Sequence, residues 1–288
     1  MKTVRALLTR ARGLLGGETT DAALDAEVLL AHVLERDRSW LYAWPEHVPE
    51  SDRIEAFERL LSLRLRGQPV GHLTGEREFW SLPLKVSADT LIPRPETEHL
   101  VEIALELDLP QDARVLDLGT GSGAISLALA SERPGWRITA VDRSEAALRV
   151  ARQNASDLGL TGPQWLNSDW FAALQPDLRF HLILGNPPYV AENDPHLGLG
   201  DLRFEPRQAL ISGADGLHDI RLITAEAPTH LEAGGWLWLE HACDQGERVR
   251  QLLRQRGFRQ VGLRRDLAGQ ERHSGGRWMP EAGPQASG

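Results

Sequence analysis

The sequence Asn186-Pro187-Pro188-Tyr189 directly follows the apolar run FHLILG, where a buried strand is expected to end. Two adjacent prolines fix φ twice and remove two backbone donors, so this stretch is rigid. The side-chain oxygen of Asn186 and the backbone carbonyl of Pro187 can each accept a hydrogen bond from an N–H group. Such a pair of acceptors can hold a planar NH₂ group with its lone pair aimed at an electrophilic carbon. Tyr189 offers a flat face on which a planar group can stack.

A second motif, DLGTGSG at 117–123, lies where an apolar strand gives way to a helix. Gly119, Gly121 and Gly123 allow sharp turns and a close approach of the backbone to a ligand. The Lys-Ser/Thr pair of a phosphate-binding Walker loop does not follow. Asp142 ends the next predicted strand, about 20 residues further on, where an acidic side chain accepts hydrogen bonds from ribose hydroxyls. This motif predicts an adenosine-type cofactor, NAD or S-adenosylmethionine, without choosing between them.

The two motifs together favour S-adenosylmethionine over NAD. A nicotinamide dehydrogenase would share the glycine loop and Asp142, but it has no use for Asn-Pro-Pro-Tyr. A binding module that holds the cofactor without catalysis is a further alternative. The residues therefore predict an enzyme that methylates a planar NH₂ group without a covalent enzyme intermediate.

Apolar strands that alternate with helices predict the fold that positions these motifs. Stretches 113–119, 136–142, 180–186 and 234–242 are too apolar for a sheet with one exposed face. Strands buried on both faces and separated by helices indicate an α/β fold with a doubly wound, mostly parallel sheet. We predict four segments: an N-terminal helical bundle at 1–73, a β-hairpin linker at 74–93, the catalytic domain at 94–280 and a disordered tail at 281–288.

Composition limits the classes of function. The formal net charge of -9 and the pI of about 5.6 lower the expectation of a nucleic-acid partner, since such proteins usually carry a basic face. The single cysteine, Cys243, excludes an internal disulfide framework, and we expect it to be a buried small hydrophobe. No run approaches a membrane span or a secretory signal, so we expect a cytoplasmic protein. We separately expect a monomer. The histidine spacing suggests no metal site.

Four further stretches carry a resemblance to a known family. They are IPRPETE (92–98), RFEP (203–206), GADGL (213–217) and DLAGQERH (266–273). With DLGTGSG and Asn-Pro-Pro-Tyr, the chain resembles the peptide chain release factor glutamine methyltransferases over most of its length. The resemblance implies a seven-stranded methyltransferase sheet and N5-methylation of the glutamine in the Gly-Gly-Gln motif of class 1 release factors. It also implies S-adenosyl-L-methionine as cofactor, S-adenosyl-L-homocysteine as product and no metal.

The resemblance also implies roles for individual residues. The catalytic group would be Asn186, Pro187 and Tyr189. The cofactor would be bound by Gly119, Thr120, Gly121, Ser122, Gly123, Asp142, Asp169, Trp170 and Asn186. The substrate would contact Asn186, Pro187, Pro188, Tyr189, Arg94 and Glu98.

Alternatives remain open at this point. Asn-Pro-Pro-Tyr is shared with nucleic-acid amino-methyltransferases, against which the acidic balance and the segment 92–98 argue. A related enzyme that methylates a glutamine of a large-subunit ribosomal protein is separated only by the flanking signatures. We further predict that the long loop 190–217 folds over the bound substrate, because loops of this length inside compact domains are usually functional. The helices at 1–73 would dock the substrate protein or serve only as a structural cap.

Overall fold

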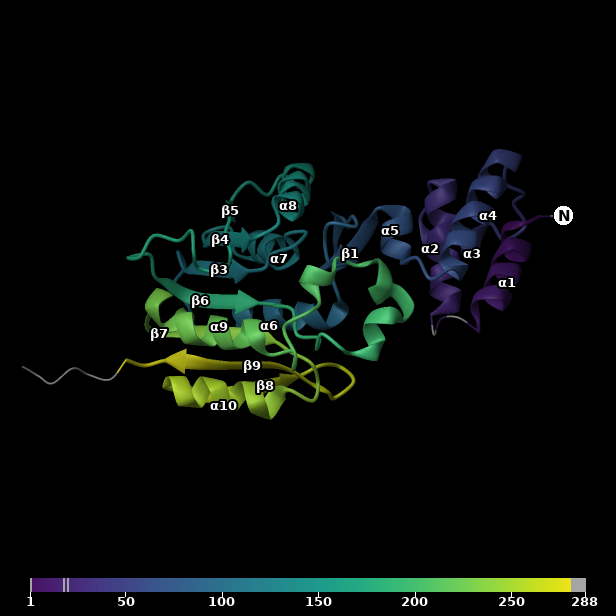
Figure 1. Cartoon of the computed structure of the whole chain (residues 1–288). Coiled ribbons are helices and arrows are strands. Elements are labelled where there is room, and N and C mark those ends of the chain that lie inside the picture. Colours follow the sequence, from purple (N-terminus) through teal and green to yellow (C-terminus); the bar gives the residue numbers. More distant parts are fainter. Residues whose placement is uncertain (1, 18, 20, 281–288) are drawn as a thin grey trace, which may run out of the picture. The chain divides into compact units, whose positions relative to one another are not determined.

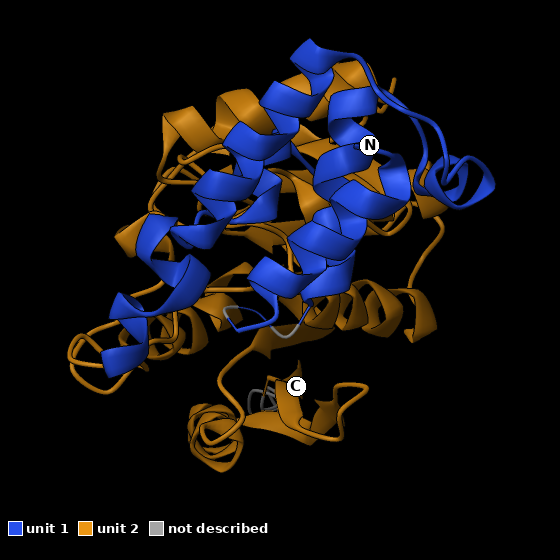
Figure 2. Ribbon diagram, turned by 90° about the vertical axis from the view of Figure 1, so that its right-hand side faces the viewer, with its two compact units in different colours: residues 1–76, 195–204 blue, residues 77–194, 205–288 orange. Residues whose placement is uncertain are grey.

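The computed structural model describes residues 2–17, 19 and 21–280. The described chain divides into two compact units, shown in different colours in Figure 2. Unit 1 comprises residues 1–76 and 195–204, and unit 2 comprises residues 77–194 and 205–288. The tail predicted at 281–288 lies outside the described residues. The segment 195–204, which the sequence analysis places in the catalytic domain, thus clusters with the N-terminal helices.

Unit 1 is helical (Figure 1). Its apolar residues recur at helical spacing and pack into one core that includes Leu29, Phe57 and Leu61, each almost fully buried. The fourth helix begins at Ser51. The helices are α1 (Val4–Leu15), α2 (Ala22–Leu34), α3 (Arg38–Ala43), α4 (Ser51–Leu65) and α5 (Val70–Thr74), with the short 3₁₀ turns η2 (Pro195–Gly198) and η3 (Gly200–Phe204) in the second segment.

A buried ion pair ties the second segment of unit 1 to its helices. Arg64, on α4, is 9% exposed and donates to Asp25 Oδ2 at 2.8 Å and to Asp201 Oδ1 at 2.6 Å. Arg203 adds a hydrogen bond from Nη2 to the backbone oxygen of Arg66 at 3.0 Å. A guanidinium that is taken out of water needs such partners, since an unpaired buried charge is strongly destabilising. These contacts explain why 195–204 belongs to the helical unit.

Unit 2 begins with a two-stranded sheet and continues into a seven-stranded one (Figure 1). The order in the large sheet is β5-β4-β3-β6-β7-β9-β8, with β9 antiparallel to both of its neighbours and the other pairs parallel. The predicted doubly wound, mostly parallel sheet of seven strands is confirmed. The strands are β1 (Glu76–Phe79), β2 (Leu82–Lys85), β3 (Arg114–Leu118), β4 (Arg137–Asp142), β5 (Gln164–Asn167), β6 (Phe180–Gly185), β7 (Leu231–Glu240), β8 (Phe258–Arg265) and β9 (Glu271–Trp278).

Helices cover both faces of the large sheet. Alternate residues of one strand point to opposite faces, and Val115 and Leu116 of β3 accordingly belong to two different core clusters. The Val115 cluster includes side chains of α6 (Glu98–Glu106), α7 (Ala124–Glu132) and α8 (Glu145–Asp157). The Leu116 cluster includes α9 (His218–Glu226) and α10 (Gly246–Arg256). Both strand faces are buried, as the continuous apolar runs predict.

The strand order reverses between β3 and β6. The chain builds β4 and β5 on one side of β3 and then crosses to the other side to form β6. Leu118 pairs with Gly185, so the glycine loop after β3 and the Asn-Pro-Pro-Tyr stretch after β6 leave the sheet at the same edge. Ligands of open α/β sheets bind in the crevice at such a switch point.

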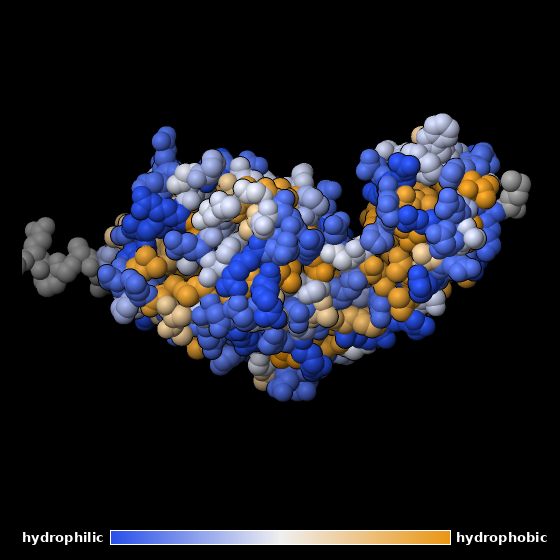
Figure 3. Space-filling view, turned by 90° about the horizontal axis from the view of Figure 1, so that it is seen from above, coloured by the Kyte–Doolittle hydropathy of each residue, from blue (hydrophilic) through white to orange (hydrophobic). Residues whose placement is uncertain are grey.

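The surface corrects one prediction. Cys243 is exposed, because it lies in the turn between β7 and α10 rather than in the core, so its assignment as a buried hydrophobe is wrong. Hydrophilic residues predominate on the face shown in Figure 3, and apolar residues form separate patches there. Within the described residues, none of the helices combines the length and the apolar character needed to cross a membrane.

Candidate active site

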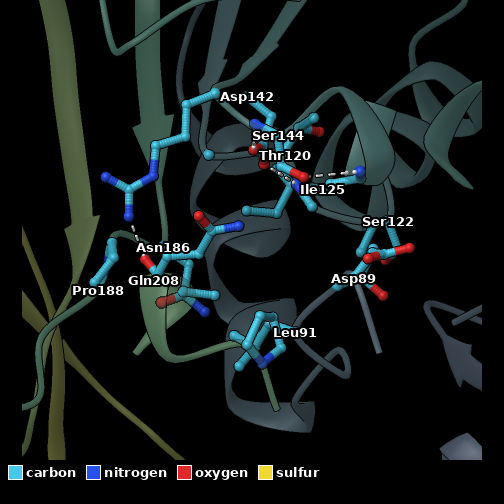
Figure 4. A pocket seen from close by; sticks show the side chains of 18 of the residues that line it. Asp89, Leu91, Thr120, Ser122, Ile125, Asp142, Ser144, Asn186, Pro188 and Gln208 are labelled. Carbon is cyan, nitrogen blue, oxygen red and sulfur yellow. Dashed lines mark hydrogen bonds between the residues drawn. The ribbon is translucent and has the colours of Figure 1, made fainter. Parts of the chain in front are cut away.

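One pocket of unit 2 lies at this edge of the sheet (Figure 4). Figure 4 shows Thr120, Asp142 and Ser144 together in one part of the pocket, and Asn186, Pro188 and Gln208 in another. The structure thus brings the two sequence motifs to one cavity. The predicted site residues that line it are Gly119, Thr120, Gly121, Ser122, Asp142, Asp169, Trp170, Asn186 and Pro188.

The glycine loop forms because its backbone enters the left-handed region. Gly121 has φ +57° and Gly123 has φ +86°, values that favour glycine. Gly123 precedes α7, and a Cβ at this position would lie 3.0 Å from the Trp165 ring and 3.2 Å from Ala151. This residue is therefore needed for close helix packing and does not line the pocket.

Asp142 connects the loop to the end of β4. Its Oδ2 accepts a hydrogen bond from Gly121 N at 2.9 Å, and its Oδ1 accepts one from Ser144 N at 2.8 Å. Burial raises the pKa of the carboxyl above its usual range, against the effect of these two hydrogen bonds. Ser144 caps α8 by accepting from Ala147 N. Each carboxylate oxygen keeps a second lone pair for a ligand hydroxyl.

Asp117 stabilises the glycine loop through side-chain hydrogen bonds. The residue is fully buried, and its Oδ2 accepts hydrogen bonds from Thr120 Oγ1 and Ser126 Oγ, both at 2.7 Å. Its Oδ1 has no hydrogen-bond partner in the described part of the chain. Burial raises the pKa of the Asp117 carboxyl to about 6, and the negative charge of Asp142 adds to this increase.

This raised pKa predicts a pH-dependent stability difference for Asp117→Asn. The folded state binds the proton more tightly, so the wild type loses stability as the pH rises from about 4 to about 6, by about 3 kcal/mol in total. The neutral variant lacks this loss. We expect its free energy of unfolding, relative to wild type, to increase between pH 4.5 and 7.5, as measured by denaturant titration. A relative stability that stays constant over this range would contradict the assignment.

Trp170 and Asp169 follow β5 at the pocket wall. A Cβ on Gly119 would lie 3.5 Å from the Trp170 ring, in ordinary van der Waals contact, so it is the backbone φ of +71° that favours glycine there. The indole Nε1 donates to Asp219 Oδ1 at 3.2 Å, which fixes the ring orientation. The backbone of Trp170 has φ +47°, an uncommon conformation for a bulky residue that occurs mostly at functional sites. Asp169 is exposed at the pocket rim.

The Asn-Pro-Pro-Tyr stretch presents two hydrogen-bond acceptors. Asn186 is half-buried and uses its Nδ2 as a donor to Thr97 Oγ1 at 3.1 Å. Its Oδ1 and the backbone oxygen of Pro187 accept no hydrogen bond from the described residues. Pro187 itself is buried, between two residues that line the pocket. Asn186 lines the pocket, so its Oδ1, together with the neighbouring Pro187 carbonyl, is left to accept from a ligand.

Tyr189 lies behind the pocket wall rather than in it. Its ring packs against the Leu116 core cluster, and its hydroxyl donates to Glu240 Oε1 at 3.1 Å. Burial, followed by the negative charge of Glu240, raises the pKa of the phenol above its usual range, so the hydroxyl stays protonated. The predicted stacking on this ring stays a prediction.

Arg94 and Glu98 do not line the pocket. Arg94 forms an ion pair with the buried Glu205, whose Oε2 also accepts from Ile92 N at 3.2 Å. Glu98 Oε1 accepts from Trp80 N at 2.8 Å and so joins α6 to the hairpin. In this structure both residues hold backbone segments together, and their predicted contact with substrate stays a prediction.

Several lining residues were not predicted from the sequence. The apolar wall of the pocket includes Leu91, Pro93, Ile125, Pro206 and Ala209. Pro93 and Pro206 occur in the family-like stretches IPRPETE and RFEP, which were the available signal.

A hydrogen bond also links two pocket residues that the sequence analysis missed. Arg143 Nη2 donates to the backbone oxygen of Gln208 at 2.7 Å, which ties the segment after 205 to the end of β4. The 190–217 loop is thus not one structural element, since 195–204 belongs to unit 1 and 206–209 borders the pocket. Its closure over substrate stays a prediction. Among the described residues, no group of three or more His, Cys, Asp or Glu side chains is arranged to hold a metal ion.

Family models match both parts of the chain. Residues 6–75 match the model described as PrmC N-terminal domain, and residues 97–205 match the methyltransferase small domain. Two solved structures share the fold. The hMettl16 catalytic domain, solved with a 3'UTR hairpin, has a TM-score of 0.55 at 15% identity over 78% of this chain and 84% of its own. The T. thermophilus 16S rRNA N2 methyltransferase, solved with AdoMet and guanosine, has a TM-score of 0.50 at 20% identity. The match covers 70% of this chain and 49% of that chain.

The sheet, its switch-point pocket and the domain match define the class of this protein as a methyltransferase. Curated relatives narrow this class. The release factor glutamine methyltransferase of Vibrio cholerae is 48% identical over 97% of this chain and 98% of its own length. The release factor glutamine methyltransferase of Pseudomonas aeruginosa is 51% identical over 91% of this chain and 94% of its own length. The chain belongs to the release factor glutamine methyltransferase family.

Proposed function

We propose that this protein transfers a methyl group from S-adenosyl-L-methionine to the side-chain amide nitrogen (N5) of a glutamine in class 1 peptide chain release factors, within their Gly-Gly-Gln motif. One observation carries the proposal. Two acceptors that have no partner among the described residues, Asn186 Oδ1 and the Pro187 carbonyl, follow β6, and Asn186 lines one pocket together with the glycine loop. A primary amide has two N–H groups to donate, which matches this pair. The names of the relatives supply the release factor.

The glycine-loop half of the pocket fits an adenosine-type cofactor. Asp142 would accept from the ribose hydroxyls with its remaining lone pairs, and the Trp170 ring would pack near the adenine. Asp169 would accept from the adenine amino group. The backbone of 119–123 would approach the rest of the ligand, because glycines leave space there. When bound, S-adenosylmethionine would supply an electrophilic methyl group and leave as S-adenosyl-L-homocysteine.

The protein's own contribution to the reaction is orientation. Asn186 Oδ1 and Pro187 O would hold both amide hydrogens, so that the nitrogen lone pair is turned out of conjugation and toward the methyl carbon. The nitrogen gains a C–N bond and loses one proton to solvent as or after the bond forms. Positioning of this kind can supply up to about 7–11 kcal/mol of a barrier. Tyr189 is not a base in this scheme, because its phenol is neutral and donates to Glu240.

Unit 1 would bind the substrate protein. Near its third helix it exposes Tyr42 and Trp44, each 60% accessible, and Val48 at 45%. Exposed aromatic residues are typical anchors of protein interfaces. We propose that the helices at 1–73, with the segment 195–204, dock the release factor, with 74–93 as linker and the rest of 94–280 as catalytic domain. The enzyme would act as a monomer, without direct contact to nucleic acid, in the cytoplasm, where release factors work.

Transfer of a tritiated methyl group tests this function. The purified chain is incubated with labelled S-adenosylmethionine and, in separate reactions, with a class 1 release factor, a large-subunit ribosomal protein fraction and rRNA. We expect label on the release factor, on one glutamine that peptide mass spectrometry identifies as N5-methylated. A release factor with Gln→Asn in the Gly-Gly-Gln motif is the matched control. Label only on the ribosomal protein would refute the proposal in favour of a ribosomal-protein glutamine methyltransferase. Label only on rRNA would refute it in favour of a nucleic-acid amino-methyltransferase.

A further inference from the structure

A chain of buried hydrogen bonds ends on the amide of Asn186. Asn186 Nδ2 donates to Thr97 Oγ1 at 3.1 Å, and Thr97 Oγ1 donates to Glu240 Oε2 at 2.7 Å. Thr97 is 5% exposed and Glu240 is 1% exposed, so water does not compete for these groups. The three residues come from η1 (Pro95–Thr97), the end of β6 and the end of β7. The chain therefore runs from the pocket wall, which Asn186 and Thr97 line, to Glu240, which does not line the pocket.

The direction of this chain is set by chemistry. A carboxylate has acceptor oxygens only, whereas a hydroxyl has one hydrogen to donate. Because Thr97 gives its hydrogen to Glu240, its oxygen can only accept from Asn186. Asn186 must then turn its NH₂ group toward Thr97. Its Oδ1 is left for the pocket.

This direction matters because an amide side chain can be turned around. The oxygen and the NH₂ group of Asn are nearly the same size, so packing alone distinguishes them poorly. Rotation by half a turn would present an NH₂ group to the substrate. Two donors would then face each other, and the substrate nitrogen would lose one of its two acceptors.

The far end of the chain is itself fixed. Glu240 Oε1 accepts from the hydroxyl of Tyr189, whose raised pKa keeps that hydroxyl a donor. Glu240 is held in the ladder between β7 and β9, opposite His273, whose Nε2 lies 3.6 Å from Glu240 Oε2. Both carboxylate oxygens are thus occupied by donors. Glu240 cannot easily reorient and release Thr97.

We propose that Thr97 and Glu240 are positioning residues that set the orientation of the Asn186 amide, so that its oxygen and not its nitrogen meets the substrate. The inference rests on the proposed function for the identity of that substrate. Glu240 itself does not line the pocket, and it acts only through Thr97. This assignment also explains the phenol of Tyr189 as an anchor for Glu240.

Paired variants of Thr97 test the proposal by methyl-transfer kinetics. Thr97→Val keeps the shape but cannot relay the hydrogen bond, and we expect kcat to fall about 10- to 100-fold, as is common when a supporting partner is lost. Thr97→Ser keeps the hydroxyl and should recover most of this loss. The affinity for S-adenosylmethionine, measured by calorimetry, should change less than about twofold in both variants.

Thr224→Val is the matched control for loss of a buried hydroxyl. Thr224 is 3% exposed on α9, and its hydroxyl has no hydrogen-bond partner within the described residues. We expect kcat of this variant to stay within about twofold of wild type. Equal kcat for Thr97→Val and Thr97→Ser, or a loss of cofactor affinity that matches the loss of kcat, would overturn the proposal.

Glu240→Gln tests the direction of the chain with little change in shape. The new NH₂ group can donate to Thr97, whose hydroxyl can then donate to Asn186 Oδ1 and turn the amide around. We expect a fall in kcat of about 10- to 100-fold for this variant too. Kinetics near those of wild type would overturn the proposal.

Neutron diffraction separates this inference from the proposed function, since it needs no substrate. Deuterons on Asn186 Nδ2 should point to Thr97 in wild-type crystals, and the amide should be reversed in Glu240→Gln crystals. A wild-type amide with its oxygen on Thr97 would overturn the inference even in an active enzyme. Failure of wild type to methylate a release factor would instead refute the function and leave the neutron result as the test of the inference.

Discussion

Replacement of Asn186 by alanine is expected to lower the rate constant for methyl transfer by roughly 10²- to 10³-fold, by analogy with the loss of one oxyanion-hole donor. The variant lacks one of the two acceptors that have no partner in the described part of the chain, so the substrate nitrogen is held through the Pro187 carbonyl alone. Affinity for S-adenosylmethionine should fall far less. Single-turnover transfer of labelled methyl groups gives the rate constant, and calorimetry gives the dissociation constant.

A surface amide serves as the control for this substitution. Gln153→Ala removes an exposed carboxamide of α8 that donates to Asp157, so both constants should stay within about twofold of wild type. If Asn186→Ala weakens cofactor binding as much as it slows transfer, the assigned role of Asn186 is wrong.

Replacement of Asp142 by alanine should have the opposite pattern. Without the carboxylate, the ribose hydroxyls of the cofactor lose their acceptor. The backbone N–H groups of Gly121 and Ser144 lose theirs as well. Hydrogen bonds to charged groups contribute about 1.5–3 kcal/mol, so the dissociation constant for S-adenosylmethionine should rise about 10- to 150-fold. At saturating cofactor the rate of transfer should recover most of its wild-type value. Calorimetry and single-turnover kinetics again measure the two quantities.

The control for Asp142 is another carboxylate of the same domain. Asp157, at the end of α8, forms an exposed ion pair with Lys85, and exposed pairs contribute little. Asp157→Ala should leave the dissociation constant within about twofold. If Asp142→Ala binds the cofactor with wild-type affinity, the assignment of Asp142 to the binding site is wrong.

The sequence could predict the elements whose signal is local. Continuous apolar runs predict β3, β4, β6 and β7, and the hydroxyl of Ser144 predicts the start of α8. The neighbourhood of Gly121 and Asn186 also follows, because parallel strands with a reversed order bring their carboxyl ends to one crevice. The seven-stranded sheet follows from the family resemblance.

The rest depends on contacts between distant segments. Thr97 and Glu240 are separated by 143 positions, and neither has a sequence pattern that announces a hydrogen bond. The partners of Arg94 and Glu98 were hidden for the same reason, because a charged residue in a first helical turn is common without any function. Burial in a turn is equally hard to read, as the exposed Cys243 demonstrates.

Because residues 195–204 belong to the helical unit, there is a consequence for protein engineering and for evolution. Unit 1 is made from two separate stretches of chain, of which the second interrupts unit 2. Deletion of the first 76 residues would leave Asp201 without Arg64, and Arg203 without the backbone oxygen of Arg66. The amino-terminal helices therefore cannot be removed or exchanged without affecting residues 195–204. A chimera that exchanges them must carry the distant insert as well, and the two stretches are expected to have changed together.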